Sequence, residues 1–192
     1  MKKLFALALS ILCISFSSFS QTTIKPTIGL NITDFSKSDD GTAKGKVGYQ
    51  FGGSIAFGKK FYIEPGVFYV GKSTAFTISN QTNNEFKADI KGVRVPVALG
   101  LNVLGNEKSF ISVRGFGGVS GFFVTSVGDD VDKSELNSTN WGLFAGAGVD
   151  LFKFFVDMSY EWSLTDIQKD VSAINIGKSR TFYISAGLRI NL

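Results

Sequence analysis

The closing stretch of the chain, residues 181–192, has the sequence TFYISAGLRINL and alternates between two kinds of residue. Its even positions are apolar: Phe182, Ile184, Ala186, Leu188, Ile190 and Leu192. Its odd positions are mostly polar: Thr181, Tyr183, Ser185, Gly187, Arg189 and Asn191. A period of two is typical of a β-strand with one apolar and one polar face. The stretch therefore predicts a strand that continues to the last residue.

The same period runs through most of the chain after residue 21, where no helical period of useful length is present. The 19 phenylalanines suit strands, and the 22 glycines indicate close backbone approach or tight turns within a β protein. We expect eight strands, at 24–34, 46–57, 61–72, 92–103, 109–125, 140–151, 154–162 and 181–192.

The connections between these strands alternate in length along the chain. Short connections are expected at 58–60, 104–108 and around 152–153. Long polar connections are expected at 35–45, 73–88, 126–138 and 163–179. In an up-and-down meander, this alternation puts the four long loops at one end and the short turns, with both termini, at the other.

The polar face decides between a membrane barrel and a water-soluble one. It consists mainly of Gly, Ser, Thr, Asn and Ala, with isolated charges at Glu64, Arg94, Arg114, Asp157, Glu161 and Arg189. Small residues with a few charges suit the narrow lumen of an eight-stranded barrel. The apolar face approaches the roughly 9–11 residues per strand that a tilted membrane crossing needs. We therefore favour an all-β, eight-stranded antiparallel up-and-down transmembrane β-barrel, with a soluble lipocalin-like ligand-binding barrel as the alternative.

The charged residues of the polar face are expected to form a lumenal network. Asp157 and Arg189 fall at similar heights on neighbouring strands, so we expect them to pair. Buried charges must be paired wherever they occur, which favours a polar plug that fixes the barrel register over a gate or a ligand site. Such a plug would block open flow of water and ions.

The first 20 residues are typical of a cleavable signal peptide. A basic start at Lys2 and Lys3 precedes an apolar run at 4–14, and cleavage is expected between Ser20 and Gln21. The expected domains are the signal peptide, 1–20, and the β-barrel, 21–192. Removing the signal lowers the formal charge from +4 to +2, which gives no electrostatic basis for nucleic-acid binding.

The chain contains no histidine, which excludes catalysis by Ser-His-Asp or Cys-His groups and removes the commonest transition-metal ligand. We accordingly expect no catalytic residue, no cofactor and no metal site. A lipid-modifying enzyme remains an alternative only through a mechanism without histidine.

The chain resembles the small eight-stranded outer-membrane barrels of the OmpA/OmpX-like superfamily, and more narrowly the PorT-type outer membrane protein beta-barrel domain of Bacteroidota. The resemblance is carried by FSQ at 19–21, KPTIGLNITDF at 25–35, VRVPVALGLNV at 93–103, GLFAGAGVDL at 142–151 and the closing strand. It implies the outer membrane of a Gram-negative bacterium, contact with outer-membrane lipid, and insertion by the barrel-assembly machinery. That machinery would recognise the closing strand, including Phe182, Ile184, Leu188, Ile190 and Leu192.

Three functions follow as hypotheses. The first is a non-enzymatic outer-membrane barrel with periplasmic termini, which acts structurally or presents its four long loops to an unknown protein or surface ligand. The second is a narrow channel or transporter. The third follows from the PorT resemblance and is a role in the type IX secretion system.

Overall fold

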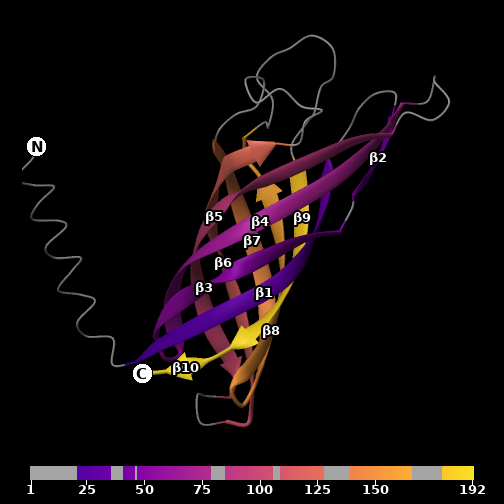
Figure 1. The fold of residues 1–192 in the computed structure, drawn as a ribbon. Coiled ribbons are helices and arrows are strands. Elements are labelled where there is room, and N and C mark those ends of the chain that lie inside the picture. The colour runs from indigo at the N-terminus through magenta and orange to yellow at the C-terminus, as the bar shows by residue number, and fades with distance from the viewer. Residues whose placement is uncertain are drawn as a thin grey trace, which may run out of the picture.

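The computed structural model describes residues 21–35, 41–45, 47–78, 85–105, 109–127, 139–165 and 179–192, and these form the strands of Figure 1. The strands are β1 (Thr22–Phe35), β2 (Gly41–Gly45), β3 (Val47–Gly58), β4 (Phe61–Ile78), β5 (Glu85–Leu104), β6 (Ile111–Val127), β7 (Thr139–Leu151), β8 (Phe154–Ser163), β9 (Ser179–Leu188) and β10 (Ile190–Asn191). No helix in these ranges has the length and apolar character needed to cross a membrane. The predicted signal peptide lies outside the described residues.

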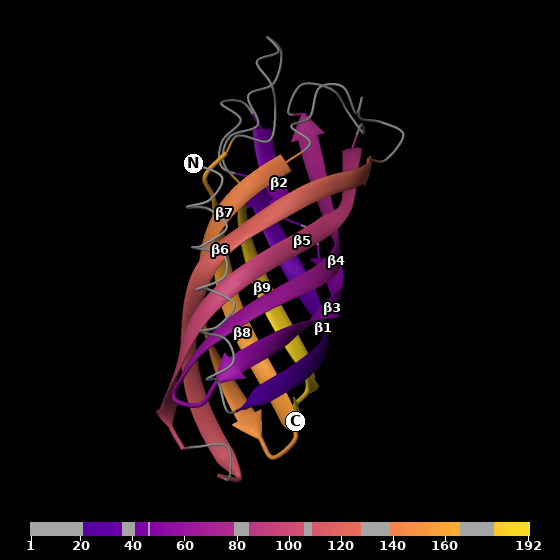
Figure 2. The ribbon, with the colours of Figure 1, turned by 90° about the vertical axis from the view of Figure 1, so that its left-hand side faces the viewer.

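The strands form one closed antiparallel barrel, seen from two directions in Figures 1 and 2. Neighbouring strands follow the order β1, β3, β4, β5, β6, β7, β8, β9, and β9 pairs back onto β1. The short β10 continues β9, and β2 lies beside β4, so the wall has eight strands. The predicted eight-stranded antiparallel barrel is confirmed.

The closing seam, formed by β9 and β10 against β1, uses almost the whole last strand. Gly187 lies opposite Thr27, and the same register continues to Asn191 opposite Thr23. The amide of Leu192 donates to the carbonyl oxygen of Thr22 at 2.9 Å. The ladder is interrupted between β9 and β10. In this register Pro26 lies opposite Leu188, the last residue of β9, and proline has no amide hydrogen to donate. Pairing to the last residues explains why the alternation continues to the end of the chain.

The two faces of the wall follow the alternation in the sequence. Large apolar side chains such as Ile28, Phe51 and Leu99 point outward and are 69%, 52% and 66% exposed. The inner face carries the polar residues together with buried rings, among them Phe155 and Tyr183. This is the arrangement of a membrane barrel, with apolar residues outside. The lipocalin-like alternative, which requires an apolar interior and a polar exterior, is therefore wrong.

The barrel has two different rims. The lower rim in Figure 1 holds the turns around Lys59–Lys60 and Phe152–Lys153, the connection from Leu104 to Ile111, and the chain end at Leu192. The four longer connections join strands at the opposite, upper rim, as predicted, and lie partly outside the described residues.

Two of the predicted long loops are shorter than expected because their ends belong to strands. β4 continues to Ile78 and β5 begins at Glu85, so residues 73–78 and 85–88 extend the wall instead of forming a loop. The short β2 lies within the predicted loop 35–45 and pairs with β4. The extensions of β4 and β5 alternate in the opposite sense to the rest of the wall, because Phe76 and Ile78 share the lumenal parity of Lys72, and Phe86 and Ala88 share that of Arg94. Their outward parity carries small or polar residues, so these segments do not continue the apolar outer face.

Candidate functional site

The charged residues of the lumen come from most strands of the barrel and fall into two groups along its axis. Each lies on the inward parity of its strand, so the pleat directs its side chain away from the apolar outer face. The lower cluster comprises Lys25, Glu64, Arg114, Asp150, Asp157 and Arg189. The upper cluster comprises Lys72, Arg94 and Glu161.

Arg114 on β6 is the centre of the lower cluster. Its Nε lies 2.8 Å from Asp150 Oδ1, and its Nη2 lies 2.7 Å from Asp157 Oδ1. Its Nη1 lies 4.0 Å from Glu64 Oε2. A single guanidinium thus joins carboxylates from β7, β8 and β4, a geometry for which its fixed fork of donors is suited.

Two further cations complete the lower cluster. The Lys25 ammonium lies 2.8 Å from Glu64 Oε1 and 3.5 Å from Asp157 Oδ2, and Arg189 Nη1 lies 2.9 Å from Asp150 Oδ2. Ser54 donates to Glu64 at 2.6 Å, and Ser112 donates to Asp150 at 2.9 Å. The lower cluster has as many carboxylates as cations, so it is neutral and each carboxylate is bonded on more than one side.

Glycines on β7 leave room for this cluster. A Cβ at Gly148 would overlap Asp157 Oδ1 and lie 3.1 Å from Arg114 Nη2. Arg114 on β6 and Asp157 on β8 therefore meet across β7, at a position that has no side chain. The abundance of glycine, which the sequence analysis linked to close backbone approach, has a specific cause here.

We predict that Gly148→Ala destabilises the barrel by roughly 1–3 kcal/mol, because the added methyl group displaces the Arg114–Asp157 ion pair. The measurement is the free energy of unfolding in lipid vesicles by urea titration. Gly115→Ala is the matched control, since a Cβ at that position meets nothing within 4 Å. Equal stability of the two variants would contradict the prediction.

The upper cluster is smaller and is stabilised partly by aromatic rings. Arg94 Nε donates to Glu161 Oε2 at 2.7 Å, and Ser120 donates to the same oxygen at 2.8 Å. The Arg94 guanidinium lies 5.0 Å from the centre of the Phe144 ring and 4.6 Å from that of Tyr183. Such contacts between cations and ring faces stabilise a charge without a second carboxylate.

Lys72 is the remaining buried cation of the upper cluster. Its ammonium donates to Thr181 Oγ1 at 3.4 Å and lies 4.7 Å from the centre of the Phe122 ring. Among the described side chains, the ion pairs within 4 Å do not include Lys72.

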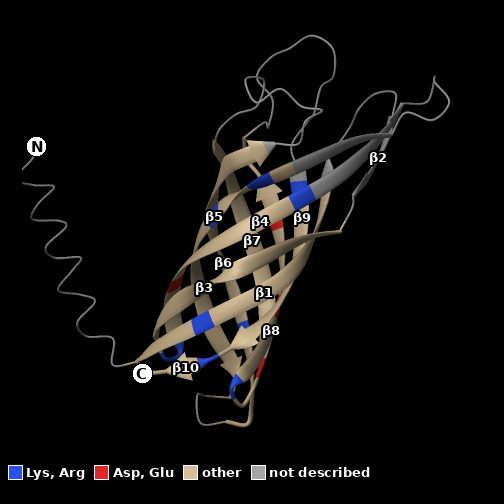
Figure 3. Ribbon diagram, in the orientation of Figure 1, with Lys and Arg blue, Asp and Glu red and all other residues tan. Residues whose placement is uncertain are grey.

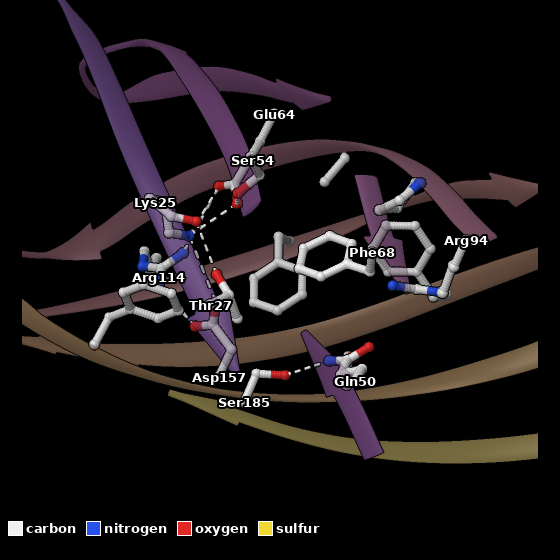
Figure 4. Close-up of a pocket in the computed structure, with 16 residues that line it drawn as sticks. Lys25, Thr27, Gln50, Ser54, Glu64, Phe68, Arg94, Arg114, Asp157 and Ser185 are labelled. Carbon is white, nitrogen blue, oxygen red and sulfur yellow. Dashed lines mark hydrogen bonds and ion pairs between the residues drawn. The ribbon is translucent and has the colours of Figure 1, made fainter. Parts of the chain in front are cut away.

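A cavity of about 60 Å³ lies between the two clusters and is lined by residues from every strand of the barrel wall. Figure 4 shows Phe68 within it, between the group around Lys25 and the Arg94 side chain. The Gln50 amide donates to Ser185 at 2.6 Å, while its carbonyl oxygen has no partner among the described residues. A polar space of this size has room for a few water molecules, which would satisfy that oxygen.

A second cavity of about 20 Å³ lies below the first, toward the lower rim. Three charged residues line both cavities: Lys25, Glu64 and Arg114. One layer of ion-paired side chains therefore separates the two spaces.

The structure places all six predicted lumenal charges inside the barrel, but it pairs them differently in one respect. Among the described residues, Asp157 pairs with Lys25 and Arg114, and Arg189 pairs with Asp150, so the expected Asp157–Arg189 pair does not form. Ser185 lies opposite Asp157, whereas the Arg189 amide donates to the Lys153 carbonyl. This offset of four residues corresponds to about 13 Å along a strand, which is too far for direct pairing.

Three members of the two clusters were not predicted from the sequence: Lys25, Lys72 and Asp150. The signal was present, because each has the same parity as the polar residues of its strand. Lys25 and Lys72 were overlooked because they lie at the ends of the predicted strands. Asp150 has the polar parity of the predicted strand at 140–151 but is not among the charges predicted for the lumen.

The other predicted residues lie at the ends of the chain. Ser20 is outside the described residues, and the carbonyl oxygen of Gln21 accepts a hydrogen bond from Gly58. The apolar residues of the closing strand belong to the outer face, where Ile184, Leu188, Ile190 and Leu192 are exposed and Phe182 is partly exposed.

Comparison with known proteins gives one family and several similar folds. Residues 19–169 match the family described as "Outer membrane protein beta-barrel domain". The fold is similar to the crystal structure of the outer membrane protein OprG from Pseudomonas aeruginosa, with a TM-score of 0.52. The two sequences are 14% identical, and the match covers 89% of this chain and 94% of that one. Ail of Yersinia pestis, crystallised with the heparin analogue sucrose octasulfate, is 16% identical, with a TM-score of 0.43 and coverage of 88% and 98%. A search of the curated proteins found no match.

Proposed function

The chain belongs to the family of outer membrane protein beta-barrel domains, and on this premise we propose that it is a sealed, non-enzymatic barrel that presents its upper rim to a partner. The partner would be a protein or a surface ligand bound by the long connections. Both termini, and with them the lower rim, would face the periplasm. Insertion would depend on the barrel-assembly machinery.

The observation that carries this proposal is the filling of the lumen. Within the described part of the barrel, the two charged clusters and the buried rings occupy the interior, and the two cavities described above measure about 60 and 20 Å³. An ion moving along the axis would have to displace the layer of Lys25, Glu64 and Arg114. The ion pairs within this layer are buried, and removing one partner of a buried pair is costly.

We predict that the wild-type barrel gives no conductance steps in planar lipid bilayers, whereas the variant Lys25→Ala/Glu64→Ala/Arg94→Ala/Glu161→Ala does. The variant removes one cation and one carboxylate from each cluster, so it leaves the net charge unchanged and opens the lumen both between the two cavities and above them. Arg180→Ala, at an exposed position of β9, is the control and should stay closed. Steps from the wild-type protein would favour the channel or transporter hypothesis instead.

The absence of histidine from the whole sequence supports a non-enzymatic role. The buried carboxylates are engaged in ion pairs and hydrogen bonds, which leaves them poorly placed to act on a lipid substrate.

A narrower hypothesis is PorT-type membership and a role in the type IX secretion system. It rests on the sequence resemblance described above. Crosslinking from residues of the upper rim in intact cells, followed by identification of the captured protein, tests it. Capture of secretion components would support this role, and capture of other surface proteins would contradict it. The same labels, if accessible from outside the cell, would support the proposed orientation.

A further inference from the structure

The exposed charges of the described barrel have a single sign. The acidic residues whose side chains are described, Glu64, Asp150, Asp157 and Glu161, all belong to the lumenal clusters. The exposed charged side chains in the same ranges are all basic: Lys59, Lys60, Lys91, Lys153 and Arg180. Three of these lysines lie in turns of the lower rim, where Figure 3 shows basic residues at the base of the barrel.

Each short turn combines a lysine with a phenylalanine that follows within two residues. The turns have the sequences KKF at 59–61, KSF at 108–110 and KFF at 153–155. Phe61 and Phe154, which begin the following strands, have the outward parity and are 70% and 61% exposed, while Phe110 precedes β6 and is 71% exposed. In the two described turns, the repeat therefore places the lysines Lys59, Lys60 and Lys153 beside exposed rings of the lower rim.

The turn between β7 and β8 carries a further ring at a conformational cost. The other two short turns each contain a glycine with positive φ, Gly58 at 124° and Gly105 at 78°. In the third turn this role falls to Phe152, which has φ of 56° and is 65% exposed. A bulky residue is rare in this conformation, which glycine adopts without strain. The neighbouring Lys153 ammonium lies 5.6 Å from the centre of its ring.

We propose that the lower rim is a binding belt for anionic glycerophospholipids. The lysines Lys59, Lys60 and Lys153 would contact the lipid phosphates, while the phenylalanine rings lie at the boundary between headgroups and acyl chains. Three observations support this assignment: the belt borders the apolar outer face, the exposed charges of the turns at 58–60 and 152–153 are all positive, and Phe152 places a ring in the rim in a conformation that glycine adopts without strain. Long basic side chains reach headgroups in this way, and aromatic residues favour the same depth.

The test uses the full-length protein in nanodiscs made from equal parts of phosphatidylcholine and phosphatidylglycerol. Lipids retained after mild detergent extraction are counted by native mass spectrometry. The triple variant Lys59→Gln/Lys60→Gln/Lys153→Gln should reduce the enrichment of phosphatidylglycerol by at least about fivefold, the effect of one basic residue near an anionic surface. Heat-modifiable gel mobility confirms that the variant is folded.

The matched control is Lys91→Gln/Arg180→Gln, which removes exposed cations from strands outside the short turns and should keep enrichment close to wild type. Unchanged enrichment in the triple variant, or an equal loss in the control, would overturn the proposal. Phe152→Gly keeps all charges and should also lower the enrichment of phosphatidylglycerol. Unchanged enrichment in this variant would show that the Phe152 ring does not contribute to lipid binding. In a third arm, added lipid A competes with phosphatidylglycerol, and its preferential retention through the three lysines would assign the belt to phosphorylated glycolipid instead.

Discussion

Deletion of residues 179–192 is expected to abolish assembly of the barrel in the membrane. The deletion removes β9 and β10, which pair with β1 along the closing seam, and it also removes the second neighbour of β8. Two strand edges would then expose their amide and carbonyl groups to lipid, where each unsatisfied group costs several kcal/mol. No rearrangement of the remaining strands can restore an edge-free wall without changing the register of the lumenal charges.

The measurement is heat-modifiable gel mobility combined with recovery of the protein in the outer-membrane fraction. A shorter deletion, residues 190–192, separates seam closure from recognition by the assembly machinery. It removes the pairs of Thr23 and Ile24 with β10, the side-chain hydrogen bond from Thr23 to Asn191 and the Leu192 hydrogen bond, and it leaves the β9–β1 pairing in place, so a complete loss of insertion would indicate a lost signal. The variant Ile184→Leu/Leu188→Ile keeps the alternation and should assemble normally. Wild-type mobility of the long deletion would refute the role of the seam.

The fold was predictable because one physical constraint acts on every strand. In a closed wall between lipid and a narrow lumen, neighbouring residues face opposite environments, so the period of two persists over long stretches. The residue types then identify the environment. Arg94 lies between Val93 and Val95 in the sequence and could face only the lumen, where the structure places it against Glu161.

The pairing of the charges was less predictable, because parity gives the face of a residue but not its height. Height depends on the stagger between strands and on where each turn begins. The Arg189–Asp150 pair spans β8 to reach β7, and nothing in the spacing of these residues along the chain indicates it. The extension of β4 and β5 was not predicted because its alternation is inverted: Phe86, Ala88 and Ile90 fall on the parity that is polar in the rest of β5.

The second large effect is expected for Arg114→Leu. This change leaves Asp150 with Arg189 and leaves Asp157 with Lys25, at 2.9 and 3.5 Å, and it gives the lower cluster an excess of one negative charge. Removing one partner of a buried ion pair costs about 3–5 kcal/mol, because the remaining charge is desolvated without compensation. The measurement is the free energy of unfolding in vesicles, with Arg180→Leu as an exposed control that should change it by less than about 0.5 kcal/mol.

The double variant Arg114→Leu/Asp157→Leu distinguishes charge balance from simple loss of packing. It removes both partners of the 2.7 Å pair and leaves Lys25 with Glu64 and Arg189 with Asp150. Replacing a buried ion pair by apolar residues is often close to neutral, so the double variant should recover most of the stability that the single variant loses. If both variants are equally unstable, the cluster stabilises the barrel through shape and volume, and the neutral plug is not its main contribution. If the single variant is as stable as the wild type, water in the neighbouring cavity already screens the cluster, and the lumen is more hydrated than a sealed barrel requires.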